Sequence, residues 1–132
     1  MFGRKVLVLS LILVLCFGAG TALALDENPP SEQLLKLTAR ANATVERLVE
    51  NAEATAARLD ELYNSGKMPY HAYYSSTQAI ANALVISTEA VLNPVKLMCA
   101  REGVSWRCEY EEVHIGPHTV YVDPIYVPGN AS

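Results

Sequence analysis

The segment NSGKMP at residues 64–69 separates two long stretches of the sequence that have helical character. Asn64 or Gly66 can adopt the left-handed conformation that ends a helix, and Pro69 fits the first turn of the next helix. A short connection of this kind leaves neighbouring helices antiparallel. The sequence therefore predicts a long antiparallel helical hairpin centred on this turn.

The stretch before the turn, from Ser31 to Tyr63, has no glycine or proline and is rich in alanine, leucine, glutamate and arginine. Ser31 is a suitable N-cap, and Glu32 places a negative charge where the helix dipole favours it. Apolar and small residues recur at intervals of three and four, as in a coiled-coil seam with a period of 3.5 residues. They are Leu34, Thr38, Ala41, Val45, Leu48, Ala52, Thr55, Leu59 and Leu62.

The second helix is predicted from Pro69 to Leu92, with an extension to Arg101 left open because Pro94 removes a backbone hydrogen bond and predicts a kink or break. Gly103 would end the short helix that follows the break. One stripe of the second helix should face the first: Tyr70, Tyr73, Thr77, Ile80, Leu84, Ser87 and Val91. A second apolar set lies on another face: Ala81, Ala83, Val85, Ile86 and Leu92. We expect the C-terminal segment or another subunit to cover that face, because a helix that is apolar on two faces must be buried on both.

The C-terminal part of the chain, residues 104–127, is rich in valine, isoleucine and tyrosine and is interrupted by glycine and proline. Residues 108–115 and 119–122 alternate loosely in polarity on either side of the Gly116-Pro117 turn, which predicts a β-hairpin. Residues 125–127 can add a short third strand. Because an isolated hairpin is marginally stable in water, we expect it to pack on the helices.

Two cysteines, Cys99 and Cys108, predict one disulfide bond between the second helix and the β-hairpin. The alternative is a pair of free thiols, which an oxidising compartment disfavours. The predicted fold class is α+β, mainly α: a long antiparallel helical hairpin followed by a small C-terminal β-hairpin tied by one disulfide. A single domain at residues 31–132 would hold all of these elements.

The N-terminus has the three parts of a secretory signal peptide in the expected order. Arg4 and Lys5 form a short basic region, and residues 6–17 are uncharged and mostly apolar. Ala-Leu-Ala at residues 22–24 provides the small side chains that signal peptidase requires. Residues 1–24 are therefore predicted to be a secretory signal peptide.

Cleavage after Ala24 would leave residues 25–30 as an extended linker before the folded domain. The alternative is an uncleaved anchor, because the uncharged segment is just long enough to span a bilayer as a helix. Both interpretations place the domain outside the cytoplasm, either secreted or anchored at its N-terminus. Without residues 1–24 the chain has eight basic and fourteen acidic residues, a net charge of −6. This balance argues against binding nucleic acid through phosphate contacts.

His114 and His118 flank the Gly116-Pro117 turn, and with Glu111 or Glu112 they could bind zinc or copper. Two surface histidines in a turn are the simpler interpretation, because this spacing matches no known metal motif. The sequence predicts no cofactor. It also lacks a defensible Ser-His-Asp arrangement, a glycine-rich phosphate loop and an HExxH motif, so no catalytic residue is predicted.

Tyrosines gather at the start of the second helix, where they either pack at the tip of the hairpin or form a patch that binds a partner. The predicted interaction surface consists of Tyr70, Tyr73, Ile80, Leu84, Val85 and Leu92. Asn42 and Asn130 lie in N-glycosylation sequons, which matter only in a host that glycosylates exported proteins. We expect a non-enzymatic exported protein that self-associates or binds another exported protein. The alternative is a module that binds a small ligand or a metal.

Overall fold

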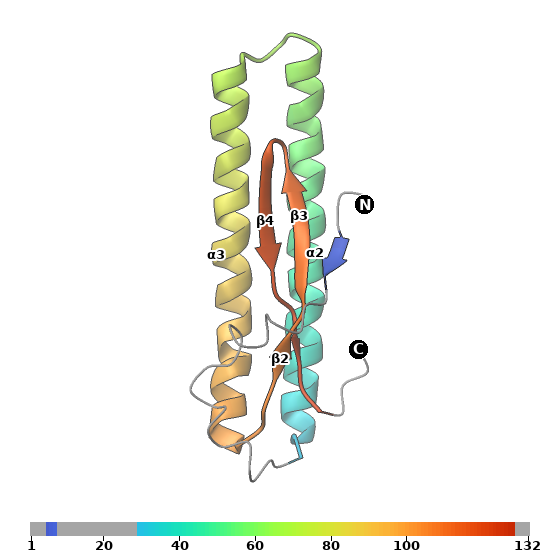
Figure 1. The fold of residues 1–132 in the computed structure, drawn as a ribbon, viewed down its shortest axis with the longest axis vertical. Coiled ribbons are helices and arrows are strands. Elements are labelled where there is room, and N and C mark those ends of the chain that lie inside the picture. The colour runs from blue at the N-terminus through green and yellow to red at the C-terminus, as the bar shows by residue number, and fades with distance from the viewer. Residues whose placement is uncertain (1–4, 8–28, 129–132) are drawn as a thin grey trace.

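The computed structural model describes residues 5–7 and 29–128. Two helices of 33 residues each, α2 (Glu32–Asn64) and α3 (Tyr70–Glu102), lie antiparallel and side by side (Figure 1). The predicted helical hairpin is therefore confirmed. In the turn between the helices, Gly66 has a φ of 79°, the left-handed conformation that glycine adopts without steric cost.

The free ends of the two helices are tied together. Ser31 is the N-cap of α2, because its hydroxyl accepts a hydrogen bond from the Leu34 N–H at 3.1 Å. Ser31 also donates to both carboxylate oxygens of Glu102, from its N–H at 3.1 Å and from its hydroxyl at 2.7 Å. Gly103 then ends α3 with a φ of 71°. One serine thus caps α2 and joins it to the last turn of α3.

α3 continues through Pro94 to Glu102, so the extension of the helix that the sequence left open is present and a break at Asn93-Pro94 is not. Pro94 lies on the exposed side of the helix, as does Ala90, whose carbonyl loses its intrahelical donor there. That carbonyl can bond to water instead. On the opposite side Leu92 and Val95 are almost completely buried, and their packing holds the helix together across the proline.

The C-terminal segment forms antiparallel strands, as predicted. β3 (Tyr110–Ile115) and β4 (His118–Val122) make a hairpin, while β2 (Arg107–Cys108) pairs with β5 (Ile125–Tyr126). Gly116, with a φ of 58°, and Pro117 form the two-residue connection, and the pairing of Ile115 with His118 closes it. A positive φ at the first of two central residues is typical of a type II′ hairpin turn.

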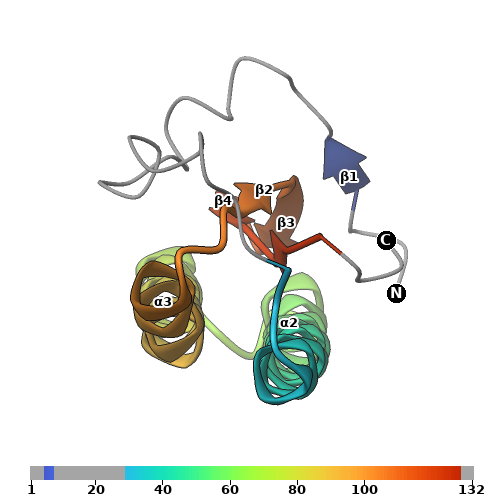
Figure 2. The ribbon, with the colours of Figure 1, turned by 90° about the horizontal axis from the view of Figure 1, so that it is seen from below.

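The strands lie in a second layer across one face of the helix pair (Figure 2). The core lies between the two layers. Its largest fully buried apolar side chains are Leu34, Val45, Val49, Leu92, Val95, Val113, Ile115, Val122 and Ile125. The C-terminal segment therefore covers one apolar face of both helices, and the opposite face of the helix pair is left open among the described residues.

The buried stripes of both helices follow an eleven-residue repeat. On α3 the buried residues are Tyr73, Thr77, Ala81, Leu84, Thr88, Leu92, Val95 and Cys99; on α2 they are Leu34, Thr38, Ala41, Val45, Val49 and Ala56. An apolar stripe that repeats every eleven residues, or three helical turns, does not impose the left-handed supercoil that a seven-residue repeat imposes on a helix pair. The predicted 3.5-residue period was therefore wrong beyond Val45: Leu48 and Leu59 are only half-buried, and Thr55 and Leu62 are exposed.

Three buried threonines allow the layers to approach closely without leaving hydroxyls unsatisfied. Thr38 donates to the Leu34 carbonyl at 2.8 Å, and Thr77 donates to the Tyr73 carbonyl at 2.8 Å. Thr88 donates to the carbonyl of Val85 at 3.0 Å. Each hydroxyl finds its acceptor within its own helix, so a short polar side chain is buried at little cost.

β1 (Lys5–Leu7) pairs antiparallel with the outer edge of β3, with Lys5 opposite Glu112 and Leu7 opposite Tyr110. These three residues lie within the predicted signal peptide. The rest of that segment, including the predicted cleavage site, lies outside the described residues.

Candidate interaction site

The outer face of α3 carries the two most exposed large apolar side chains of the described chain. Ile86 is 66% exposed and Leu97 is 65% exposed. They are eleven residues apart, which is about three helical turns plus 20°, so they lie on the same side of the helix. Between Ala79 and Ala100 the sequence has only two charged residues, Glu89 and Lys96. This side of α3 is therefore a mostly apolar surface open to solvent, uncharged between Ile86 and Leu97, with Asn93 as an exposed polar residue between them.

Sequence reasoning placed Ile86 in the second apolar set of the helix and missed Leu97. The signal that could have found the pair is the eleven-residue spacing that also relates Leu84 to Val95 in the core. Because the outer pair follows the same repeat as the core, the two stripes stay on opposite sides along the helix.

The predicted interaction surface does not hold together in the structure. Leu84 and Leu92 are 4% and 1% exposed and belong to the core, so neither can contact a partner. Ile80 and Val85 are half-buried. The apolar part of the predicted interaction surface therefore faces the strand layer and α2 rather than solvent.

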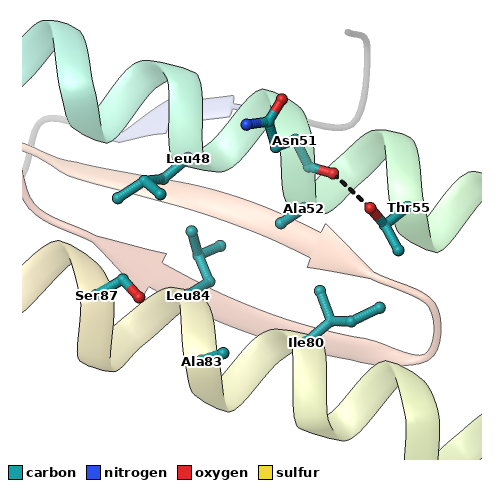
Figure 3. Close-up of a pocket in the computed structure, with 8 residues that line it drawn as sticks. All are labelled: Leu48, Asn51, Ala52, Thr55, Ile80, Ala83, Leu84 and Ser87. Atoms are coloured by element: carbon teal, nitrogen blue, oxygen red, sulfur yellow. Dashed lines mark hydrogen bonds between the residues drawn. The ribbon is translucent and has the colours of Figure 1, made fainter.

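A shallow groove of about 220 Å³ runs between the helices on the face away from the strands (Figure 3). The residues that line it are Leu48, Asn51, Ala52, Thr55, Ile80, Ala83, Leu84 and Ser87. Small-molecule sites usually enclose about 300–1,000 Å³ and bury most of their ligand. This groove is smaller and more open, so it does not favour the predicted alternative of a small-ligand module.

α3 is also the helix within the described ranges that is long and apolar enough to cross a membrane by length and composition. The core helix of a soluble protein meets the same criterion. Since the inner face of α3 packs on α2 and on the strand layer, packing accounts for that half of its apolar surface.

The tyrosines near the turn form a connected aromatic cluster. Tyr63 stacks on Tyr73 with ring centroids 4.7 Å apart, and Tyr70 and Tyr74 lie about 6 Å from each other. Tyr73 is buried and donates a hydrogen bond to Asp60 at 2.5 Å, which links α3 to α2. Burial, followed by this hydrogen bond to a carboxylate, raises the pKa of Tyr73 to about 12. Packing therefore explains Tyr73, whereas Tyr70, at 51% exposed, remains accessible.

The two histidines considered as weak candidates for a metal site, His114 and His118, lie on opposite faces of the hairpin. His118 pairs with buried Ile115 and faces α3, where its Nε2 lies 3.1 Å from the Thr77 hydroxyl oxygen. His114 faces solvent beside Thr119, its Nδ1 lying 3.2 Å from the hydroxyl oxygen. The two-residue turn pairs His118 with Ile115, so these two side chains share one face and His114, the residue before Ile115, points to the other. No group of three metal-binding side chains occurs in the described parts of the chain.

The predicted disulfide between Cys99 and Cys108 is absent, because Cys99 is a free thiol. Cys99 is fully buried in the core between helices and strands, whereas Cys108 packs in a separate small cluster with Trp106 and Tyr110. Burial, with a smaller contribution from the Glu102 carboxylate, raises the pKa of the Cys99 thiol to about 11. Cys99 therefore acts as a small apolar core residue.

Asn42, one of the two weak glycosylation candidates, has a structural role in the fold. Its Nδ2 donates to the Ile125 carbonyl at 2.7 Å, and its Oδ1 accepts from the Ile125 N–H at 3.1 Å. A glycan is attached at Nδ2, so it would disrupt this contact between α2 and β5. The other sequon, at Asn130, lies outside the described residues.

Comparison of the chain with models of known protein families, with curated proteins and with solved structures finds no match.

Proposed function

We propose that this is an exported, non-enzymatic protein that acts by associating with itself through the outer face of α3. The observation that carries the proposal is the exposure of Ile86 and Leu97 on a helix face with few charges. A single exposed leucine or isoleucine is ordinary, but two in line on an uncharged helix face are typical of an interface.

Burial of the two exposed side chains would stabilise the contact. Fully burying one large aliphatic side chain contributes about 1.5–3 kcal/mol. A contact that covers both Ile86 and Leu97 on each of two copies can therefore supply several kcal/mol. Ala83, one turn before Ile86, and Ala90, between Ile86 and Leu97, are also exposed and would let a partner helix approach closely.

Export is supported by the order of the basic, apolar and small-residue regions in residues 1–24. A non-enzymatic protein that acts by binding another molecule needs a rigid binding surface and does not need a reactive side chain. The two packed layers provide that rigidity for α3.

The test is the mass of the full chain by size-exclusion chromatography with light scattering at micromolar concentration. We expect a defined oligomer, and we expect the double variant Ile86→Glu/Leu97→Glu to be a monomer because it places charge within the contact. The matched control is Ala43→Glu/Ala54→Glu on α2, two exposed positions that are also eleven residues apart. A wild-type monomer, or equal dissociation of both double variants, would contradict the proposal.

A core variant separates association from folding. Leu92→Ala should lower the free energy of unfolding by about 2–5 kcal/mol, because it leaves a cavity. At temperatures where the variant is folded, its oligomeric state should match the wild type, since Leu92 is 1% exposed. Loss of the oligomer in folded Leu92→Ala would place the contact elsewhere.

A further inference from the structure

The charges on α3 bear on which way a second copy would lie. Glu89 and Lys96 are seven residues apart, about two helical turns, so they share one edge of the outer face. That edge adjoins the strand layer: the Lys96 ammonium lies 5.4 Å from the centroid of the Trp106 ring, and both residues act electrostatically on Asp123. The outer face is thus an apolar surface bordered by one acidic and one basic residue on the same side.

We propose that α3 packs antiparallel against α3 of a second copy, with the twofold axis between Val91 and Leu92 and with Ile86 beside Leu97 of the second copy. This inference rests on the proposed function and adds the orientation and register of the second copy. The axis position follows from the sequence, because it is the midpoint of the Ile86–Leu97 pair. Each large side chain then meets a different large side chain, and Ala83 meets Ala100.

Charge complementarity selects the antiparallel orientation. A twofold axis perpendicular to the helices keeps the charged edges of the two copies on the same side of the contact. Glu89 then lies about two residues, or ~3 Å along the axis, from Lys96 of the second copy. Two equivalent acid–base pairs would therefore border the apolar contact, as an isologous interface requires.

A parallel arrangement lacks this match. Its twofold axis runs along the helices, so the charged edges lie on opposite sides of the contact and Glu89 has no basic neighbour from the second copy. It would also place Ile86 against Ile86 and Leu97 against Leu97. The two orientations therefore differ in which residues become neighbours, and cross-linking can distinguish them.

The experiment uses full-length Ile86→Cys and Leu97→Cys, each alone and both co-expressed with different affinity tags. Both positions are exposed, so the substitutions should preserve the helical circular dichroism signal. In the antiparallel contact the two positions are adjacent between copies, whereas two copies of residue 86 are about 16 Å apart along the axis. We expect a disulfide between differently tagged chains after mild oxidation and at least tenfold less cross-linking in either variant alone. Oxidised wild type gives the background from the native cysteines.

Four outcomes would overturn the inference. Cross-links in each single variant alone would indicate a parallel contact through the same face, and the proposed function would survive. An oligomer without cross-links would place the contact elsewhere, so that self-association would stand but not the outer face of α3 as its site. A monomer by light scattering would remove the proposed function as well. A monomer that instead floats with anionic or zwitterionic lipid vesicles would assign the apolar face to a membrane surface.

Charge reversal provides a second, independent test. Glu89→Lys should raise the dissociation constant at least severalfold, because it places like charges together at both borders. Glu89→Lys/Lys96→Glu should restore at least half of the lost affinity, because the pair is re-formed with its signs exchanged. Failure of the double variant to recover affinity, with the oligomer intact in wild type, would overturn the orientation and leave the self-association standing.

Discussion

Gly116 is the residue at which the tip of the strand layer touches α3. A Cβ atom at this position would lie 2.8 Å from Thr77 Cγ2 and 3.0 Å from the Tyr73 hydroxyl. Thr77 is completely buried, so it has no room to move away. The glycine is required both by the positive φ of the turn and by the close approach of the hairpin to the helix.

Gly116→Ala should therefore lower the free energy of unfolding by roughly 2–5 kcal/mol, combining left-handed strain with overpacking. Gly66→Ala is the matched control, because Gly66 also has a positive φ but has nothing within 4 Å of an added Cβ. That variant should lose only about 1–2 kcal/mol. Urea denaturation measures both, and equal losses would mean that the contact with Thr77 is unimportant.

Tyr73 makes stability depend on alkaline pH. Its folded pKa of about 12 is above the ordinary value of 10, so the unfolded chain loses the phenol proton first. The stabilising effect of the neutral phenol is complete below pH 10 and is lost as pH rises toward 12, by up to about 2 kcal/mol. Tyr73→Phe should remove this part of the pH dependence.

The alkaline effect is measured by urea denaturation at several pH values between 9 and 12. Tyr121→Phe serves as the control, because Tyr121 is 49% exposed. Its stability curve should parallel the wild type across the range. A Tyr73→Phe curve as steep as the wild type would show that another group is responsible.

At the scale of the element, α2 and α3 show what local patterns can and cannot predict. The turn residues and the absence of helix breakers indicated both helices, because those signals depend on neighbours in sequence. The sequence did not decide between a seven- and an eleven-residue repeat on α2. After Val45, Leu48 continues the first repeat and Val49 continues the second, and both residues are apolar. The strand layer decides between them, since it covers Val49 and leaves Leu48 at the groove.

The break predicted at Pro94 failed for a related reason. A proline disrupts one hydrogen bond, but the flanking core residues of α3 are held by contacts from distant parts of the chain. Pro94→Ala should restore the bond to the Ala90 carbonyl and raise the free energy of unfolding by about 1–3 kcal/mol. Pro69→Ala, at the N-cap position of α3, should change stability little. A loss of stability in Pro94→Ala, measured by thermal denaturation, would show that the proline is needed for packing.

At the scale of the whole molecule, the sequence predicted the order of the elements and the packing of the hairpin on the helices. It did not predict what joins the layers. A disulfide was expected from an even number of cysteines in an oxidising compartment, but Cys99 and Cys108 face different clusters. The weaker metal-site alternative rested on His114 and His118 flanking one turn, and the alternation of strand side chains separates them. The observed tie, the Asn42 side chain on Ile125, spans 83 residues and has no local signal.

Asn42→Ala should therefore loosen the strand layer from α2. It removes two hydrogen bonds and leaves the Ile125 N–H and carbonyl without this partner, for an expected loss of about 2–3 kcal/mol. Asn82→Ala, at an exposed position of α3, should be neutral or slightly stabilising. Fluorescence of Trp106, the only tryptophan, reports on the strand layer during denaturation. Equal stability of the two variants would show that the amide contributes nothing net.

If residues 1–24 are cleaved as the sequence predicts, the pairing of β1 with β3 would distinguish the precursor from the processed chain. Lys5–Leu7 cannot be removed with a signal peptide and also occupy the edge of β3, so the edge is covered only while the N-terminal segment is attached. After processing, the backbone at Tyr110–Glu112 would become an open edge, protected from aggregation by its charged side chains. Successive N–H groups of a strand point to opposite neighbours, so only those N–H groups at Tyr110–Glu112 that point toward β1 would lose their partner. Amide hydrogen exchange at these groups would report the removal of residues 1–24: slow in the unprocessed chain, and fast once they are gone.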